Sequence, residues 1–323
     1  MGKTSETQMR AVRFERYGPP DVLTVQKVAV PEPGAGQVLV KAFGSSVNPA
    51  EAQVRAGKFK LLTGSKFPKG IGEDFSGEIV AVGEGVERSL VGRRVWGTDL
   101  GLKSETTAEY IVVKESVTAW APSRHDPVTL AALPTVGLTA LLALRTVGVK
   151  AGGRVLIVGA AGGVGSAAVQ LAHALGARVA TVSGSANTDL CRELGAVAAY
   201  EYARLSTDPI TEKFDAVIDL YGADPGVYRS LLVKGGRMVC LAAKGMGYSM
   251  KSAFLPGPRV RTARMKPSRA DLDTLARHVE KGELRAVVEQ IYPMEEIAEA
   301  HRAVETGHSR GKRVIQIVEN LSS

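Results

Sequence analysis

The residue types that most clearly suggest chemistry lie in a glycine-rich stretch, Gly159 to Gly165. Its spacing is A-x-G-x-x-G, with Ala160 where the common dinucleotide fingerprint has its first glycine. A turn that lacks side chains lets a pyrophosphate reach the free N–H groups and the positive dipole end of the helix that follows. We therefore predict a phosphate-binding turn. The residues expected to contact the cofactor there are Gly159, Ala160, Gly162, Gly163 and Val164.

The residue that ends the next strand indicates which dinucleotide is bound. An acidic side chain about 20 residues beyond the glycines would bind the ribose 2′-hydroxyl of NAD. Here Ser183 stands at that place, and Asn187 follows shortly after. Neither group repels a 2′-phosphate, and both can donate hydrogen bonds to it, so the pattern favours NADP(H). The alternative is that Ser185 or Asn187 caps a helix beginning near Thr188, and the two roles are compatible.

Three elements must position this turn. The apolar run Val155–Val158 is rich in β-branched residues and predicts a buried parallel strand. Apolar residues then recur at helical spacing from Val164 to Leu175, and Gly176 ends the predicted helix. Val179–Val182 predicts a second strand. A dinucleotide turn requires this strand–turn–helix–strand context, and the alternative is a glycine turn that serves packing alone.

The chain before Pro127 has a different texture from the chain after it. Residues 10–125 contain short alternating strands separated by Gly and Pro, which predicts a small β-barrel. From Pro127 onward apolar helices and strands alternate, with Pro134 between two of the helices, which predicts a doubly wound parallel sheet. Arg259–Thr262 is expected to form its edge strand. The segments after it are expected to return to the first domain, which would then be discontinuous.

Composition limits the class of protein further. With 323 residues, 45% of them hydrophobic, two globular domains are expected. The only cysteines, Cys191 and Cys240, suit a reducing cytoplasm and cannot build a disulfide framework. The start of the chain has no apolar core typical of a secretory signal, and no apolar run is long enough to span a membrane. The net charge of +8 is spread along the chain without an aromatic platform, so no nucleic acid is expected as a partner.

Several segments together resemble one known family. They lie between Val12 and Val318 and are Val47–Glu51, Gly72–Glu78, Leu133–Leu142, Gly159–Gly165 and Gly311–Val314. In their joint order they are similar to the medium-chain dehydrogenase/reductase superfamily, specifically its zinc-free quinone oxidoreductase, or zeta-crystallin-like, branch. The resemblance implies an α/β protein with a Rossmann domain and a discontinuous GroES-like β-barrel domain. It also implies a homodimer joined through the edge strand of the Rossmann domain.

The sequence pattern and the resemblance together give the expected domain boundaries. We expect a disordered tail over residues 1–9, a GroES-like catalytic domain over 10–125 and 264–323, and a Rossmann NADP(H)-binding domain over 126–263. Zinc-dependent relatives carry a cysteine in the early loop, a Gly-His-Glu segment and a four-cysteine lobe. This chain has Gly72-Glu73-Asp74 and no cysteine before Cys191, so thiolate and imidazole ligands are missing and no metal is expected.

Site residues follow from the matching motifs. The resemblance places Asn48 near the nicotinamide and the substrate, as the catalytic candidate, and Thr135 and Thr139 in the nicotinamide-ribose pocket. It places Tyr202 against the adenosine 2′-phosphate. The alternatives are that Asn48 caps the helix after Pro49, that Thr139 is a buried helical hydroxyl, and that Tyr202 is a surface aromatic. The cofactor site is also expected to include three strand-end residues, Leu220, Leu241 and Ala242.

At the substrate end the chain departs from the family pattern. Many quinone and enoyl reductases have a tyrosine shortly after Asn-Pro, whereas this chain has Gln53 and Phe59 at the two common tyrosine sites. Neither side chain can act as a general acid, so water could supply the proton. Tyr221 is expected either to line the substrate pocket or to pack. Arg55 and the lysines of the same loop are expected to be solvated charges.

The expected reaction is NADPH-dependent reduction of a quinone or of an activated C=C bond in an α,β-unsaturated carbonyl compound. The nicotinamide would supply the hydride, and the Asn48 amide, backbone N–H groups or a cofactor hydroxyl would stabilise the developing oxyanion. One alternative is an enoyl or enone reductase dedicated to a single pathway. The other, from a different class, is a non-catalytic NADPH-binding or sensor protein.

Overall fold

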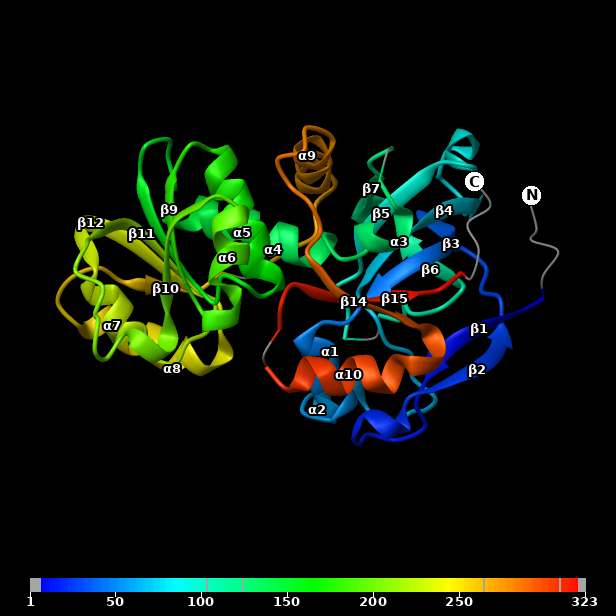
Figure 1. Cartoon of the computed structure of the whole chain (residues 1–323). Coiled ribbons are helices and arrows are strands. Elements are labelled where there is room, and N and C mark those ends of the chain that lie inside the picture. Colours follow the sequence, from blue (N-terminus) through cyan, green and yellow to red (C-terminus); the bar gives the residue numbers. More distant parts are fainter. Residues whose placement is uncertain (1–6, 103, 124, 264, 308, 319–323) are drawn as a thin grey trace. The chain divides into compact units, whose positions relative to one another are not determined.

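The computed structural model describes residues 7–102, 104–123, 125–263, 265–307 and 309–318 (Figure 1). The chain divides into two compact units. The first takes the described residues of Met1–Thr135, Lys266–Glu280 and Ala286–Ser323, and the second takes those of Val136–Met265 and Lys281–Arg285. Among the described residues, no helix is long and apolar enough to cross a membrane.

The first unit is built on a sheet in which seven described strands take part. The strand order is β14-β15-β3-β4-β5-β7, with β6 also paired to β3. The strands are β3 (Gln37–Ser46), β4 (Asp74–Val82), β5 (Arg94–Thr98), β6 (Tyr110–Lys114), β7 (Thr118–Trp120), β14 (Val288–Pro293) and β15 (Lys312–Gln316). Neighbouring strands are antiparallel except for β14 and β15. A separate antiparallel ribbon joins β1 (Gln8–Arg13) to β2 (Thr24–Ala29), shown in blue in Figure 1.

Short helices accompany this sheet. They are α1 (Pro49–Arg55), α2 (Lys60–Thr63), α3 (Pro127–Leu130), α9 (Arg269–Glu280) and α10 (Ile297–Glu305), with 3-10 turns at Pro20–Val22, Arg88–Leu90, Glu115–Val117 and Met294–Glu296. α10 lies beside α1 and buries one face, including Ile297, Ala300 and Val304, against Phe14 and the neighbouring core (Figure 1). The C-terminal segments therefore return to the first unit, as predicted.

The second unit contains a parallel sheet of six described strands in the order β10-β9-β8-β11-β12-β13. In chain order these strands are β8 (Arg154–Val158), β9 (Arg178–Ser183), β10 (Ala196–Glu201), β11 (Phe214–Asp219), β12 (Leu232–Cys240) and β13 (Val260–Arg261). Counted along the chain, the order is 3-2-1-4-5-6, the doubly wound arrangement that binds dinucleotides at the carboxyl ends of its strands. The predicted edge strand at Arg259–Thr262 is therefore present as β13.

Helices connect the parallel strands. They are α4 (Pro134–Val147, whose first two residues belong to the first unit), α5 (Gly163–Ala174), α6 (Thr188–Glu193), α7 (Pro225–Ser230) and α8 (Met246–Lys251), with 3-10 turns at Ser185–Asn187, Tyr202–Arg204, Ala243–Gly245 and Ser252–Phe254. The core strands β8 and β11 are buried almost throughout, which explains their continuous apolar sequences.

The structure differs from the predicted elements at several places. Gln8 and Met9, assigned to a disordered tail, begin β1, while residues 1–6 lie outside the described part. β10 was not predicted, because its sequence AVAAYE is half-buried and carries little strand signal. The two helices predicted around Pro134 are present as separate helices, but the second begins at Pro134 itself instead of near Leu138, since proline is well tolerated in the first turn.

The edges of the compact units also differ from the predicted domain boundaries. Residues 126–135 were assigned to the Rossmann domain, but they belong to the first unit because α3 packs on β3 and β4. Residues 281–285 belong to the second unit, where the Arg285 N–H donates to Gln170 Oε1 over 2.9 Å. Both differences depend on contacts between distant segments.

Candidate active site

The glycine turn between β8 and α5 has the shape of a phosphate cradle. Gly159 has φ +82°, a conformation that favours glycine, and Gly162 immediately precedes the helix. A Cβ on Gly165 would lie 2.2 Å from the Gly159 carbonyl oxygen, so only glycine lets the helix pack this closely. A Cβ on Gly162 would meet only the Gly159 carbonyl oxygen, at 3.6 Å. Since the first N–H groups of a helix have no partner within it, the turn fits a pyrophosphate.

Ser183 ends β9, as predicted, but its hydroxyl is used inside the unit. The side chain is buried, the hydroxyl donates to the Gly184 carbonyl over 3.2 Å, and it accepts a long contact from the Cys191 thiol at 3.7 Å. Asn187 precedes α6, and within the described residues its side chain makes no capping hydrogen bond. The capping alternative for Asn187 is therefore not seen, and Ser185 is exposed.

Tyr202 lies at the phosphate turn. Its hydroxyl is 3.7 Å from a Cβ built on Gly159, and Leu220 Cβ is 3.3 Å from the same point. The Tyr202 and Tyr221 ring centroids are 5.0 Å apart, and the Lys244 ammonium stands 5.7 Å from the Tyr221 centroid. Burial, reinforced by neighbouring groups, raises the pKa of Tyr202, so its phenol is a neutral hydrogen-bond donor. The fold thus brings Tyr202 close to Leu220 and Tyr221. The sequence predicted these three residues for different parts of the site.

Asp219 is a buried acidic residue at the end of β11 that the sequence did not single out. One carboxylate oxygen accepts the N–H groups of Tyr221 and Gly222 at 2.9 and 2.8 Å, and the other lies 3.6 Å from the Cys240 thiol. Burial and this carboxylate raise the pKa of Cys240 to about 11. Asp219 therefore shapes the turn that carries Tyr221. Leu241 and Ala242, both half-buried, follow β12 at the same edge, where the Leu241 N–H donates to the Asp219 carbonyl.

In the first unit, Asn48 is the centre of a buried polar cluster. It immediately precedes α1, and its Nδ2 donates to Glu51 Oε1 and to Asp74 Oδ2, both over 2.9 Å. Its Oδ1 accepts a hydrogen bond of 2.6 Å from Lys312 Nζ. Two carboxylate acceptors and one ammonium donor leave only one orientation for the amide. Both amide hydrogens and the amide oxygen are therefore already engaged.

Asp74 and Lys312 complete this cluster. Asp74 is fully buried, and it accepts hydrogen bonds from the Ser46 hydroxyl at 2.7 Å and from the Thr135 N–H at 2.8 Å. Lys312 Nζ lies 3.7 Å from Asp74 Oδ2 and donates to the Val47 carbonyl over 2.9 Å. Both residues lie in motifs that carry the family resemblance, but their local sequence indicates no role for either. The signal in the sequence was that Asp74 and Lys312 each lie in a short glycine-containing motif. Only the fold shows that the two side chains lie close together.

Several carboxyl groups surround the single ammonium group of Lys312 in this cluster. Burial raises the pKa of Glu51 well above its usual range, and the neighbouring carboxylates of Glu73 and Asp74 add to this effect. Burial also raises the pKa of Glu73 to about 7, with Asp74 and Asp99 adding and the Lys312 ammonium opposing. Burial therefore favours the neutral form of the Glu51 carboxyl, and at neutral pH Glu73 is close to half protonated.

The remaining predicted pocket residues come from two parts of the chain. Gln53 is half-buried on α1, and Phe59 is half-buried at the start of α2, where its carbonyl accepts the Thr63 hydroxyl at 3.1 Å. Thr135 Oγ1 lies 2.8 Å from Thr98 Oγ1, and Thr139 is half-buried on α4 in the second unit.

The prediction for Arg55 is wrong, because its side chain is buried instead of solvated. It donates to the Gly18 carbonyl over 2.7 Å and pairs with Glu305. Position in a variable loop suggested exposure, whereas the return of α10 covers this side of α1.

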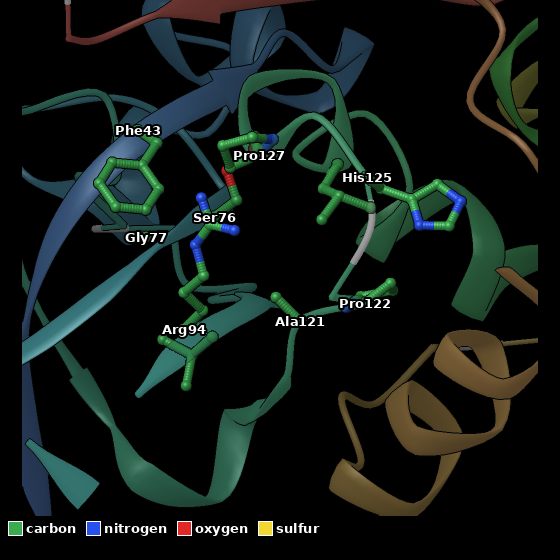
Figure 2. A pocket seen from close by; sticks show the side chains of 10 residues that line it. Phe43, Ser76, Gly77, Arg94, Ala121, Pro122, His125 and Pro127 are labelled. Carbon is green, nitrogen blue, oxygen red and sulfur yellow. Dashed lines mark hydrogen bonds between the residues drawn. The ribbon is translucent and has the colours of Figure 1, made fainter. Parts of the chain in front are cut away.

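A separate hollow in the first unit is not a candidate active site. Figure 2 shows the Arg94 guanidinium directed toward Ser76, with Phe43 beside it and the His125 ring turned away. The guanidinium carbon is 5.8 Å from the Phe43 centroid, and the Ser76 hydroxyl donates to the Pro127 carbonyl. The hollow is too narrow for a water molecule and includes none of the predicted site residues.

The described residues were compared with what a zinc site requires. Among the described residues, no group of three or more His, Cys, Asp or Glu side chains is arranged to hold a metal ion. At Asn48, Asp74 and Glu73 the available donors are amide and carboxylate oxygens, and the Lys312 ammonium already binds there. The residues of this cluster therefore do not fit a tetrahedral zinc with thiolate or imidazole ligands.

Two protein-family models match the chain. Residues 34–123 match the alcohol dehydrogenase GroES-like domain, and residues 194–315 match a model described as zinc-binding dehydrogenase. Together with the doubly wound sheet, these matches define a dehydrogenase/reductase with a GroES-like and a Rossmann domain, as predicted.

Individual relatives narrow the family. The chain is 32% identical to the chloroplastic NADPH-dependent alkenal/one oxidoreductase of Arabidopsis thaliana, covering 95% of this chain and 79% of that protein. It is 33% identical to the 2-methylene-furan-3-one reductase of Solanum lycopersicum, covering 96% and 79%. The solved quinone oxidoreductase of Coxiella burnetii superposes with a TM-score of 0.89 at 32% identity, covering 96% of this chain and all of that one. The chain belongs to the quinone oxidoreductase branch of the medium-chain dehydrogenase/reductase superfamily.

Proposed function

We propose that this protein is an NADPH-dependent oxidoreductase that transfers hydride to a quinone or to an activated C=C bond of an α,β-unsaturated carbonyl compound. One observation carries the proposal. A phosphate cradle that tolerates only glycine at Gly165 precedes a strand ending in Ser183 without an acidic side chain, in a chain similar to NADPH-dependent alkenal and quinone oxidoreductases. NADPH, when bound, supplies the hydride.

The chain's own residues bind and orient the reactants. The N-terminus of α5 would hold the pyrophosphate, and the Tyr202 phenol beside Gly159 would donate to an anionic oxygen of the cofactor. Ser183 and Asn187 are proposed to leave room for the 2′-phosphate. Leu220, Leu241 and Ala242 are proposed to line the cofactor site along the same sheet edge.

Asn48 is proposed to stand beside the nicotinamide, and Thr135 and Thr139 are proposed to line the nicotinamide-ribose pocket. Because both Asn48 amide hydrogens go to carboxyl groups, a substrate oxygen could receive one only if Glu51 or Asp74 released it. Gln53, Phe59 and Tyr221 are proposed to shape the substrate pocket. The reaction is proposed to proceed without zinc, since the cluster at Asp74 takes a lysine ammonium as its cation.

The first test is NADPH oxidation at saturating cofactor with a panel of quinones, enones and enoyl thioesters, repeated with NADH. We expect turnover with quinones or enones and a strong preference for NADPH over NADH. Turnover confined to enoyl thioesters would identify the pathway-specific reductase. Tight NADPH binding without turnover on any acceptor would contradict the proposed reaction and favour the binding or sensor protein.

We also propose a homodimer formed through β13, at the edge of the parallel sheet. The two buried, free cysteines are compatible with a reducing compartment, and we propose the cytoplasm.

A further inference from the structure

Two neighbouring leucines on α2 are exposed instead of buried. Leu61 is 94% exposed and Leu62 is 69% exposed, whereas Thr63, the polar residue that ends the same helix, is buried. A surface helix ordinarily turns its apolar side chains toward the core and its polar ones outward, so the polarity of α2 is reversed. Single exposed apolar residues are normal, but two adjacent leucines exposed to this extent indicate a surface that binds something apolar.

A polar and aromatic anchor holds α2 in this orientation. The Tyr17 hydroxyl donates to the Gly64 carbonyl and lies beside the Thr63 hydroxyl. Lys69 Nζ donates to the Thr63 carbonyl over 3.0 Å and lies 4.8 Å from the Phe67 ring centroid. The Tyr17 and Phe67 centroids are 5.1 Å apart. Because Thr63 is held by these contacts, the leucines cannot turn inward without breaking them.

The chain around the leucines carries positive charge alone. No acidic residue occurs between Glu51 and Glu73. Three lysines in that interval, Lys58, Lys60 and Lys66, are exposed, and we call the segment from the first to the last of them the leucine loop. An apolar tip flanked by ammonium groups complements a surface that is anionic outside and apolar beneath, as a bilayer with anionic lipids is. An acidic protein surface complements the lysines but offers no apolar layer beneath its charges.

The second unit has another exposed apolar stretch, which a second copy of the chain explains better. Met250 on α8 and Phe254 in the 3-10 turn that follows are both exposed. α8 lies against β13, the edge strand through which we propose the dimer. Apolar side chains beside a strand edge suit a protein interface. We therefore assign the bilayer to the leucine loop and not to α8.

We propose that the leucine loop docks on the surface of an anionic lipid bilayer. Its two leucines enter the lipid, and its lysine ammonium groups bind headgroup phosphates while their apolar stems lie along the interface. The loop lies on the bilayer and does not cross it. Phe59, proposed to shape the substrate pocket, belongs to this loop, so docking brings part of that pocket to the layer in which apolar quinones dissolve. This last consequence rests on the proposed function, whereas the docking does not.

The first test measures binding of the whole chain to vesicles by sedimentation. We expect binding to phosphatidylcholine vesicles that contain one third phosphatidylglycerol, and at least about tenfold weaker binding to phosphatidylcholine alone. Leu61→Ser/Leu62→Ser should weaken binding to the anionic vesicles at least about tenfold, because two apolar side chains no longer leave water. Met250→Gln is the control and should bind as wild type does. Loss of binding in Met250→Gln, with normal binding in the leucine variant, would overturn the assignment.

A pair of charge variants separates the leucine loop from the net charge of +8, which by itself attracts the chain to anionic vesicles. Lys58→Gln/Lys60→Gln removes two exposed lysines of the loop. Lys27→Gln/Lys41→Gln removes two exposed lysines of β2 and β3 in the same unit and leaves the same net charge. The loop variant should lose about fivefold in affinity per lysine, and its control should lose much less. Equal losses would show that net charge alone causes binding and would overturn the proposal.

A fluorophore attached at Leu62→Cys reports insertion directly, because both native cysteines are buried and react slowly. Anionic vesicles should shift its emission to the blue. The control is a fluorophore at Val91→Cys, an exposed position elsewhere in the first unit, which should not shift. Unshifted emission at Leu62→Cys, or no binding of wild-type protein to anionic vesicles, would overturn the bilayer as the occupant and favour an acidic protein.

Turnover measurements separate this inference from the proposed function. Leu61→Ser/Leu62→Ser should lower kcat/KM at least about tenfold for an apolar quinone dissolved in anionic vesicles and leave kcat/KM for a water-soluble quinone unchanged. Wild-type protein that binds vesicles but reduces no acceptor would overturn the proposed function alone. Wild-type protein that reduces quinones but does not bind anionic vesicles would overturn the docking alone.

Discussion

Individual polar residues in this protein acquire their roles from partners far away in the chain. Lys312 and Asn48 are separated by 264 positions, yet their side chains are joined by a hydrogen bond of 2.6 Å. A buried lysine is costly unless it is paired and fully hydrogen-bonded, and here it binds an amide, a backbone carbonyl and a nearby carboxylate. Lys312 therefore fixes the orientation of the Asn48 amide.

His301 provides a prediction about pH and stability at the residue scale. It is fully buried on α10, and neither ring nitrogen has a hydrogen-bond partner among the described residues. Burial, with a smaller contribution from Arg55, lowers the pKa of His301 from 6.5 to about 3. The unfolded chain therefore binds a proton that the folded one excludes, and stability is lost as pH falls below 6.5. We expect about 1.4 kcal/mol less unfolding free energy per pH unit in that range.

Urea unfolding at pH 7, 6 and 5 measures this loss. His301→Leu should reduce the dependence on pH, because the leucine cannot take up a proton in the unfolded chain. His173→Gln is the control, since His173 is exposed on α5. Equal losses in wild type and His301→Leu would show that other groups cause the acid sensitivity.

At the scale of elements, the junction of β8, the glycine turn and α5 places strict demands on the chain. The turn needs the left-handed conformation at Gly159, and α5 needs the absence of a side chain at Gly165. β8 and α5 could be predicted because both glycines lie in one short stretch of sequence. β10 and β7 could not, because short or half-buried strands depend on pairing partners outside their own sequence.

Gly165→Ala tests this junction. The added Cβ would lie 2.2 Å from the Gly159 carbonyl oxygen and 2.7 Å from the Ala160 backbone, so the helix must move away from the strand. We expect a destabilisation of about 1–3 kcal/mol and NADPH binding weakened at least about tenfold. Thermal unfolding and fluorescence titration with NADPH measure the two effects. Gly247→Ala, whose Cβ would meet nothing within 4 Å on α8, should neither destabilise the protein nor weaken NADPH binding, and equal losses in both variants would contradict the close-packing argument.

At the scale of the whole molecule, the chain builds its first unit from both ends. The C-terminal strands β14 and β15 complete the sheet that β3 and β4 begin, and β15 carries Lys312 into the cluster around Asn48. Loss of the last strand would therefore remove both a sheet partner and the cation of the site. The second unit ends its sheet with β13, a strand of two residues.

The proposed homodimer can be tested at this edge. Arg261→Pro removes a backbone N–H and disrupts strand pairing, so we expect a shift from dimer to monomer, measured by light scattering after size-exclusion chromatography. Arg261→Ala keeps the backbone and should remain dimeric. A wild-type monomer at micromolar concentration would exclude the proposed assembly, and a dimeric Arg261→Pro would place the interface elsewhere.

The sequence by itself determined the phosphate turn and the alternation of strands and helices, because apolar periodicity and glycine spacing are local signals read within about 30 residues. The family and its two-domain fold class followed from the resemblance carried by several motifs in their joint order. The resemblance also singled out Asn48 and Tyr202 as candidate site residues. Only the tertiary structure decided that Asn48 is locked between Glu51, Asp74 and Lys312, and that Arg55 and His301 are buried. Charge state and hydrogen bonding depend on burial and on partners up to hundreds of residues away. These properties arise only when the strands are assembled.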